Sequence, residues 1–512
     1  MSEKILVRGV NWIGDAVMTM PALRALKKAY LGSKLALLLK PSVSALFETD
    51  PFVDEIILYE NRFKGFIGKI KLARILRKKG FSKAVLFQNA FDAALAVFLA
   101  GIPERIGYDR DGRGLLLTKP IRFHHEDRKL HHIEYYLDLL RRAGIKAEYS
   151  QPWIYLSLEE RLAARERLSG LNRPILGINP GAAYGSSKRW FPERFAEVAN
   201  WFMKDTGGSV VIFGGKDETS MAQEIDHFVN RGQIQSFANT IEEAHSLLNL
   251  AGKTSLRELV SCIAECDVLI TNDSGPMHIA YAVGTPLVAI FGSTAPELTG
   301  PVEGRNMVMK HDFACSPCFA RTCATSDMRC MYSVTADDVY IGVKKLLPDK
   351  KAVFFDRDGT LCNDADYLGN WNDFKILPGV EGLGVLKNKG YSLFGVTNQS
   401  GIARGVVDEA FVKEVNQVFI DKYGFDGFYY CPHHPDEHCL CRKPEPGMVL
   451  EARHRQGIDL KRSYIIGDKE VDMALARAVG AKGILVRTGQ ERESRYADFV
   501  VDALNDAIRL VK

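Results

Sequence analysis

Short apolar runs alternate with longer amphipathic stretches of helical pattern along this chain. Clear examples of the runs are ILVRGV, KLALLL, KAVLF, ILGINPG, SVVIFGG, VLITND and PLVAIFG. A strand that is buried on both faces reads as a continuous apolar run, and a helix between two such strands returns the chain for parallel pairing. The alternation therefore predicts an α/β fold built on parallel sheets with helical crossovers.

The chain is too long for one compact core. Its 512 residues correspond to roughly three domains of ordinary size. A helical segment ends in LLPDKK before a new strand begins near Ala352, so we place the main boundary at about Asp349. A weaker boundary lies between Leu171 and Pro174, before the strand ILGINPG. The predicted domains are residues 1–170, 171–348 and 350–512.

Composition excludes several classes of protein. With 46% hydrophobic and 25% charged residues, the chain matches a folded globular protein and not a disordered one. We find no apolar run near the roughly 20 residues of a membrane-spanning helix, and SEKILVRGV lacks the pattern of a signal peptide. A formal net charge of +4 is too small to indicate nucleic-acid binding. We expect a cytoplasmic protein without a nucleic-acid partner.

The segment KAVFFDRDGTL is the strongest local motif. Asp356 and Asp358 are two residues apart at the end of a strand, where alternate side chains share a face, so both can address one phosphoryl group. A pair of solvated turn carboxylates is the alternative. Further polar residues follow in a consistent order: Thr397 and Asn398 after the strand YSLFGVTN, Lys443, and Asp468 after SYIIGD. Together they indicate a phosphate site.

This order of residues resembles the haloacid dehalogenase-type phosphatases, whose catalytic domain is Rossmann-like. The resemblance implies that Asp356 is the nucleophile and that Asp358 protonates the leaving oxygen and later activates water. Thr397 and Asn398 would hydrogen-bond the phosphate, and Lys443 would offset its charge. The implied Mg²⁺ ligands are Asp356, Asp358 and Asp468.

Between these motifs lies the loop CPHHPDEHCLCRKP. Its Cys431, His433, Cys439 and Cys441 form a ligand set that suits tetrahedral, structural Zn²⁺, with reduced unliganded thiols as the alternative. We expect the loop to hold Arg442 and Lys443 toward the phosphate. The pattern resembles the branch that includes heptose 1,7-bisphosphate phosphatases and histidinol phosphatases, and TNQSGIARG is closer to the heptose enzymes.

Three segments of the first 346 residues resemble glycosyltransferase family 9: VRGVNWIGDAVMTMPALRALK, NPGAAYGSSKRW and TNDSGPMHIAYAVGTPLVAIFG. The sequence from Asn11 to Asp15 favours its type II heptosyltransferases over type I. The resemblance implies a GT-B fold of two Rossmann-like domains, inversion at the heptose anomeric carbon, and no metal at this centre. Asp15 stands where a helix begins, so it is either a helix cap or the general base for the acceptor hydroxyl.

A second helix start is the candidate site for the phosphates of ADP-heptose. The strand VLITND leads into Ser274 and Gly275 before a helix, and free backbone N–H groups at a helix N-terminus bind pyrophosphate. Asp273 and His278 lie close by in the sequence, although a lone histidine is more often structural. Lys188 and Arg189 offer a further basic contact, with a solvated surface pair as the alternative.

Two segments remain ambiguous. Cys315, Cys318, Cys323 and Cys330 have spacings compatible with a metal, but we favour reduced thiols. The basic stretch from Arg62 to Lys79 is either a solvated helix face or a surface that attracts anionic lipid or the anionic acceptor.

The resemblances imply a bifunctional enzyme of lipopolysaccharide inner-core synthesis. One activity would transfer heptose from ADP-heptose to heptosyl-Kdo₂-lipid A at the inner membrane surface, with possible peripheral attachment there. The other would remove the 7-phosphate of D-glycero-D-manno-heptose 1,7-bisphosphate. One alternative is a different heptosyltransferase type joined to a histidinol phosphatase, and another is a regulatory binding protein with inactive sites.

Overall fold

The structure is a computed structural model that describes residues 3–236 and 247–512, with the side chains of 231–236 left undescribed. It divides into two compact units, Met1–Leu346 and Leu347–Lys512. Within the described residues, every helix is too short or too polar to cross a bilayer.

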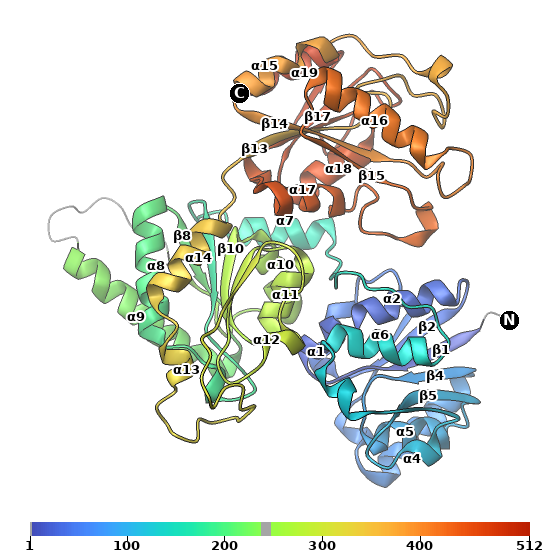
Figure 1. The fold of residues 1–512 in the computed structure, drawn as a ribbon, viewed down its shortest axis with the longest axis vertical. Coiled ribbons are helices and arrows are strands. Elements are labelled where there is room, and N and C mark those ends of the chain that lie inside the picture. Colours follow the sequence, from blue (N-terminus) through green and yellow to red (C-terminus); the bar gives the residue numbers. More distant parts are fainter. Residues whose placement is uncertain (1–2, 237–246) are drawn as a thin grey trace. The chain divides into compact units, whose positions relative to one another are not determined.

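Three parallel sheets of six strands form the framework (Figure 1). When the strands of each sheet are numbered along the chain, all three sheets have the order 3-2-1-4-5-6. In this arrangement the strand order reverses between strands 1 and 4, and ligands bind beyond the carboxyl ends of the strands at that point. The α/β class and the three Rossmann-like sheets predicted from the sequence are confirmed.

The first sheet lies in the N-terminal half of the first unit. Its strands are β1 (Lys4–Arg8), β2 (Lys34–Leu39), β3 (Glu55–Leu58), β4 (Lys83–Leu86), β5 (Glu104–Asp109) and β6 (Lys119–Arg122). The helices are α1 (Ile13–Met18), α2 (Met20–Ala29), α3 (Pro41–Ser44), α4 (Gly65–Lys79), α5 (Phe91–Leu99), α6 (His132–Arg142) and α7 (Leu158–Arg167). Ile5 and Val7 face the core that includes α2 and α6, whereas Leu6 faces α4 and α5. Both faces are therefore buried, as the continuous apolar run requires.

The second sheet lies in the C-terminal half of the same unit. Its strands are β7 (Ile175–Asn179), β8 (Ser209–Ile212), β9 (Leu247–Asn249), β10 (Val268–Asn272), β11 (Leu287–Ile290) and β12 (Asn306–Met309). The helices are α8 (Pro192–Thr206), α9 (Thr219–Ser236), α10 (Leu256–Glu265), α11 (Gly275–Val283), α12 (Pro296–Thr299), α13 (Arg329–Tyr332) and α14 (Ala336–Leu346). One apolar cluster includes side chains of both halves, and α1 packs on α11. Helix α7 precedes the predicted boundary at Leu171 but packs against α10.

The third sheet forms the second unit. Its strands are β13 (Lys351–Phe355), β14 (Tyr391–Asn398), β15 (Gly427–Cys431), β16 (Tyr464–Gly467), β17 (Lys482–Val486) and β18 (Phe499–Val501). The helices are α15 (Gly384–Asn388), α16 (Glu409–Tyr423), α17 (Gly447–Gln456), α18 (Glu470–Val479) and α19 (Leu504–Leu510). Val353 and Phe355 of the central strand pack into one core with side chains of α15, α16 and α19. This buried central strand ends directly before the acidic motif.

Candidate active sites

In the second unit, two acids stand at the point where the strand order reverses. Asp356 follows β13 and Asp468 follows β16, and these two strands are neighbours in the sheet. The ligand atoms of Asp356, Asp468 and Asp472 all lie within 4.8 Å of one another, and all three residues are buried. Asp472 was not predicted from the sequence. It lies four residues after Asp468, in the first turn of α18, and this spacing could have pointed to it.

Lys443 is the cation of this cluster. Its ammonium group lies 2.9 Å from Asp356 and 2.6 Å from Asp472, and it donates to the carbonyl of Val396 at 2.8 Å. Burial alone would lower the pKa of Lys443, but the two carboxylates outweigh burial and raise it. Lys443 is therefore charged in this site and offsets part of the negative charge.

The cluster still has three carboxyl groups for one lysine. Burial, opposed by Lys443, raises the pKa of Asp356 to about 6, and burial together with Asp356 raises the pKa of Asp468 to about 6. The Oδ1 atom of Asp468 is buried and has no hydrogen-bond partner among residues 3–236 and 247–512. Three buried acids around one lysine, with an acceptor left over, fit a hard divalent cation such as Mg²⁺.

The carboxylate of Asp358 does not join this cluster. Arg357 donates to both of its oxygens, at 2.9 and 3.1 Å, and Gln399 donates to one of them at 2.6 Å. Burial disfavours the charged form, but Arg357 and Gln399 outweigh it and the pKa of Asp358 lies below its usual range. The resemblance implied that Asp358 is a Mg²⁺ ligand, whereas in the structure the side chain beside Asp356 and Asp468 is that of Asp472.

The other side chains predicted to bind phosphate differ in whether they already have hydrogen-bond partners. The buried hydroxyl of Thr397 accepts from Gln399 at 2.9 Å, next to Asp358. The amide of Asn398 is engaged with the backbone of Lys443, accepting from its N–H at 3.0 Å and donating to its carbonyl at 3.2 Å. Asn398 thus positions Lys443. One guanidinium nitrogen of Arg442, Nη1, is buried and has no hydrogen-bond partner in the part of the chain that the structure describes.

Immediately before Arg442, the four predicted zinc ligands come together. Ligand atoms of Cys431, His433, Cys439 and Cys441 lie within 4.8 Å of one another. The sulfur atoms of Cys431 and Cys439 are 3.3 Å apart, and Nδ1 of His433 is 3.1 Å from the sulfur of Cys441. These cysteines are free thiols. Three thiols and an imidazole at these separations can bind a tetrahedral metal such as zinc.

The first unit has a different kind of site, assembled from both of its halves. Asp15 lies in the first turn of α1, and its side chain is 29% exposed. Nδ1 of His132, the first residue of α6, lies 3.4 Å from the carboxylate of Asp15. His132 was not predicted from the sequence, because more than one hundred residues separate it from Asp15 and no local pattern links them.

His278 approaches the same helix from α11. A side chain at Gly14 would place its Cβ 2.6 Å from the imidazole of His278, so only glycine permits this contact. Burial lowers the pKa of His278 to about 4 despite the nearby carboxylates of Asp273 and Asp15. The ring is therefore neutral near pH 7. The close packing explains why a glycine precedes Asp15.

The other predicted donor-site residues lie at the carboxyl end of the second sheet. Lys188 lies 2.5 Å from Asp273, which also accepts from Thr294 at 2.6 Å. The hydroxyl of Ser274, just before α11, lies 3.1 Å from that of Thr271. Arg189 instead donates to the carbonyl of Ala182 at 3.4 Å. Lys188, Asp273, Ser274 and His278 thus belong to one region, whereas Arg189 is tied to a neighbouring loop.

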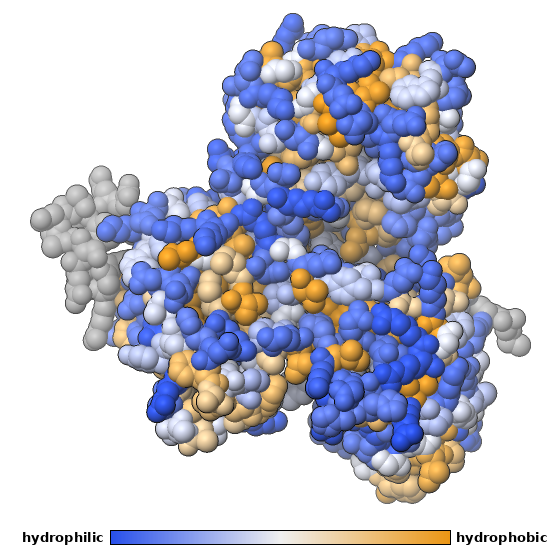
Figure 2. All heavy atoms as spheres, viewed as in Figure 1, coloured by the Kyte–Doolittle hydropathy of each residue, from blue (hydrophilic) through white to orange (hydrophobic). Residues whose placement is uncertain are grey.

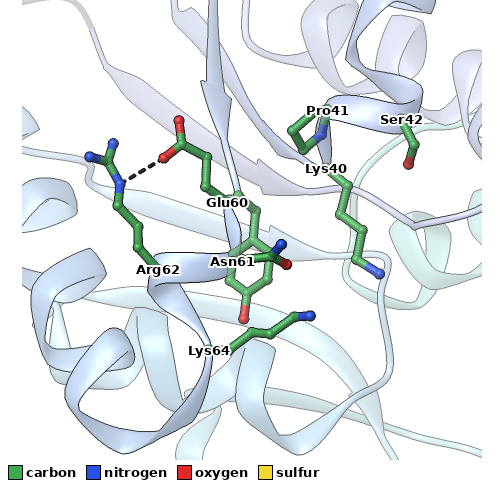
Figure 3. A pocket seen from close by; sticks show the side chains of 8 residues that line it. Lys40, Pro41, Ser42, Glu60, Asn61, Arg62 and Lys64 are labelled. Atoms are coloured by element: carbon green, nitrogen blue, oxygen red, sulfur yellow. Dashed lines mark ion pairs between the residues drawn. The ribbon is translucent and has the colours of Figure 1, made fainter.

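A basic pocket of about 590 Å³ opens beyond β2 and β3 (Figure 3). It is lined by Lys40, Pro41, Ser42, Tyr59, Glu60, Asn61, Arg62 and Lys64. Figure 3 shows Lys40 and Lys64 extending toward the same side of the pocket, while Arg62 pairs with Glu60 at 2.7 Å. Among the residues that the structure describes, the ammonium groups of Lys40 and Lys64 have no ion-pair partner, so the pocket can accept an anionic group near them.

The four cysteines of the loop between Cys315 and Cys330 are free, and Cys315 and Cys318 are exposed. The two ligand groups found among the described residues are the acid cluster and the Cys431 group, so this loop does not hold a compact ligand set. Reduced thiols remain our interpretation of the loop.

Two family models match the chain. The model for glycosyltransferase family 9 (heptosyltransferase) matches residues 69–328, and a HAD-hydrolase-like model matches residues 440–507. The two matches fall in different units of the structure.

Individual relatives divide in the same way. Lipooligosaccharide heptosyltransferase 2 of Campylobacter jejuni is 32% identical over 346 residues, which cover 67% of this chain and 99% of the relative. D-glycero-beta-D-manno-heptose-1,7-bisphosphate 7-phosphatase of Vibrio cholerae is 43% identical over 174 residues, 31% of this chain and 94% of the relative. The solved structure of Escherichia coli ADP-heptose LPS heptosyltransferase II superposes with a TM-score of 0.56 at 29% identity, covering 67% of this chain and 98% of that one.

Proposed function

Because the chain belongs to glycosyltransferase family 9 in its first unit and to the heptose 1,7-bisphosphate 7-phosphatases in its second, we propose that it is a bifunctional enzyme of lipopolysaccharide inner-core synthesis. The first unit transfers heptose from ADP-heptose to heptosyl-Kdo₂-lipid A. The second removes the 7-phosphate of D-glycero-D-manno-heptose 1,7-bisphosphate. The observation that carries the proposal is that each unit has its own set of reactive side chains at the carboxyl ends of its own strands.

In the phosphatase, Asp356 attacks the phosphorus atom and forms an aspartyl phosphate while the sugar oxygen leaves. Asp358 donates a proton to that oxygen and then takes one from the water that hydrolyses the intermediate. The contacts of Arg357 and Gln399 hold Asp358 in place and favour its carboxylate form, which suits the second step. For the first step Asp358 must first take up a proton from solvent. Lys443 and Arg442 supply positive charge to the phosphate.

Two metals fit the residues of this unit. Mg²⁺ would be held by Asp356 and Asp468, with Asp472 beside them, and when bound it supplies positive charge that offsets the phosphate and the surrounding acids. Zn²⁺ would be held by Cys431, His433, Cys439 and Cys441 in a structural role. Because Arg442 and Lys443 directly follow the last of these ligands, an ordered loop keeps both cations directed at the phosphate site.

In the transferase, Asp15 is the general base that takes the proton of the acceptor hydroxyl as that oxygen attacks the heptose anomeric carbon. His132 orients the carboxylate of Asp15 from the neighbouring helix. The ADP leaving group lies against Ser274, Gly275 and the N-terminus of α11, where backbone N–H groups face its phosphates. Lys188, oriented by Asp273, contributes positive charge.

The basic pocket beyond β2 and β3 is our candidate for the anionic sugars and phosphates of the acceptor. Lys40 and Lys64 line it, and β1, which leads into the loop before Asp15, is the neighbour of β2 in the same sheet. Because the acceptor is a membrane lipid, we place the enzyme at the cytoplasmic face of the inner membrane, attached peripherally.

A substrate comparison tests the proposal. The purified chain should release phosphate from heptose 1,7-bisphosphate much faster than from histidinol phosphate, and should transfer heptose from ADP-heptose to heptosyl-Kdo₂-lipid A. Preference for histidinol phosphate would identify a different phosphatase. Absence of both activities in the folded protein would favour a binding role.

A further inference from the structure

Helix α4 carries an exposed apolar pair beside the basic pocket. Phe66 is 66% exposed and Ile67 is 71% exposed, in the first turn of the helix. The side of α4 that packs on the core consists of other residues, including the buried Leu72, Ala73 and Leu76. The apolar pair therefore does not belong to the core. Figure 2 shows hydrophobic side chains gathered at the end of the N-terminal half where Figure 1 labels α4 and α5, next to hydrophilic surface.

Apart from Ile75, the other exposed side chains of α4 are cationic. Ile67, Lys71, Arg74 and Lys78 follow one another at spacings of four, three and four residues, so they line one face of the helix. The helix contains no acidic residue. Within the described part of the chain, Lys71, Arg74 and Lys78 are exposed and make neither an ion pair nor a side-chain hydrogen bond. Lys69 is different, because it is buried and pairs with Asp92 at 2.6 Å.

We propose that the exposed face of α4 docks on an anionic lipid bilayer, with Phe66 and Ile67 entering the interface and Lys71, Arg74 and Lys78 contacting the headgroups. An apolar edge next to lysines and arginines is the combination that binds such surfaces, since burial and electrostatic attraction act together. A purely solvated helix face would need no apolar pair at its end.

The exposed face of α4 lies next to the basic pocket in the sequence. Lys64, which lines the basic pocket, is two residues from Phe66. Docking through α4 would therefore hold the pocket at headgroup level, where the charged sugars of a lipid-anchored acceptor lie. This part of the inference rests on the proposed transferase function, whereas docking itself does not.

Vesicle binding by the full-length protein tests the docking. We expect binding to vesicles of phosphatidylethanolamine and phosphatidylglycerol, weakening as salt is raised, and little binding to phosphatidylcholine vesicles. The double variant F66S/I67S should bind the anionic vesicles about tenfold or more weakly, because both apolar contacts are lost. The triple variant K71Q/R74Q/K78Q should lose the preference for anionic lipid.

Leu31→Ser is the matched control. Leu31 is 82% exposed, but it precedes β2 and lies at the amino ends of the strands, whereas Lys40 follows the carboxyl end of β2. This variant should bind vesicles like the parent. Equal vesicle binding by F66S/I67S and the parent, or a parent that ignores anionic vesicles, overturns the proposal. Loss of binding in the control to the same extent would also overturn it.

A second assay separates docking from catalysis. With a water-soluble, deacylated acceptor, F66S/I67S should transfer heptose at the parental rate, whereas transfer to acceptor embedded in vesicles should fall. Slower transfer to the soluble acceptor would place these side chains in the acceptor site instead of on the membrane. A parent that transfers to neither acceptor would refute the proposed transferase function and leave the vesicle result intact.

Discussion

The two units place a reactive carboxylate in opposite surroundings. Asp356 is buried, follows the central strand of one sheet and contacts a buried lysine. Asp15 is partly exposed in a short helix, and its neighbours come from α6 of its own half and α11 of the other half. The phosphatase site is therefore complete within one sheet, whereas the transferase site requires two.

The chemistry explains this difference. A phosphoenzyme forms on a carboxylate that must be held rigidly among charges in a site with little water, and a single packed domain supplies that environment. Glycosyl transfer brings together two large substrates that must enter and leave, so a site between two halves is suitable. We therefore expect phosphatase activity to be sensitive to substitutions among its buried charged residues. Transferase activity should depend on partly exposed residues such as Asp15.

The largest effect is expected at the phosphatase nucleophile. Asp356→Asn should lower phosphate release by about 10³-fold or more, because the amide cannot form the proposed phosphoenzyme. Phosphate release and heptose transfer should be measured on the same preparation, and transfer should stay within a few-fold of the parent. Loss of both activities in a folded variant would contradict separate sites.

At the transferase base the expected effect is smaller. Asp15→Asn should slow heptose transfer by roughly 10²-fold, since the acceptor hydroxyl loses its proton acceptor, while ADP binding stays similar. The turnover rate at saturating ADP-heptose measures the expected loss of transfer. Calorimetry with ADP checks that ADP binding is unchanged. Normal turnover would remove Asp15 from the mechanism, and phosphate release serves as the internal control.

The zinc content of the protein should distinguish the two units, because only the phosphatase unit is proposed to need the metal. About one zinc per chain is expected in the purified protein, and Cys439→Ser should remove it, lower the thermal stability of the second unit and reduce phosphate release about tenfold. Heptose transfer should not change. Two zinc ions per chain would show that the loop from Cys315 to Cys330 also binds metal. Full phosphatase activity without zinc would argue against the structural role.

His132 tests whether the transferase base needs an orienting partner. His132→Ala should reduce turnover by about threefold to tenfold with little change in KM for ADP-heptose, because the carboxylate of Asp15 loses a contact but keeps its place in α1. His132→Gln, which retains a donor, should recover part of the loss. The same loss in both variants would indicate that His132 acts only through packing.

The smallest effect should follow separation of the units. Residues 1–348 and 350–512, expressed apart, should each retain their own activity within about twofold, because each is long enough to bury a core. The structure divides the chain at Leu346 and Leu347, close to this cut. Two folded fragments that work only when mixed would show that the sites depend on each other.

Much of this molecule is readable from local patterns. The apolar run before Asp356 predicted a buried strand, and the adjacent acids and glycine predicted the phosphate site at its end. The spacing of Cys431, His433, Cys439 and Cys441 predicted a ligand group, because all four lie in one short loop. Such features are visible in the sequence since the residues that cooperate are neighbours along the chain.

The sequence by itself therefore determined the three α/β sheets and the two families, and it supplied the candidates for most of the proposed reactive residues. Tertiary structure alone decided which side chains meet. It brought His132 to Asp15, placed Asp472 beside Lys443, and engaged the amide of Asn398 with the backbone of Lys443. These contacts depend on how helices and loops from distant parts of the chain pack on a sheet, and packing geometry leaves no periodic or local signal in the sequence.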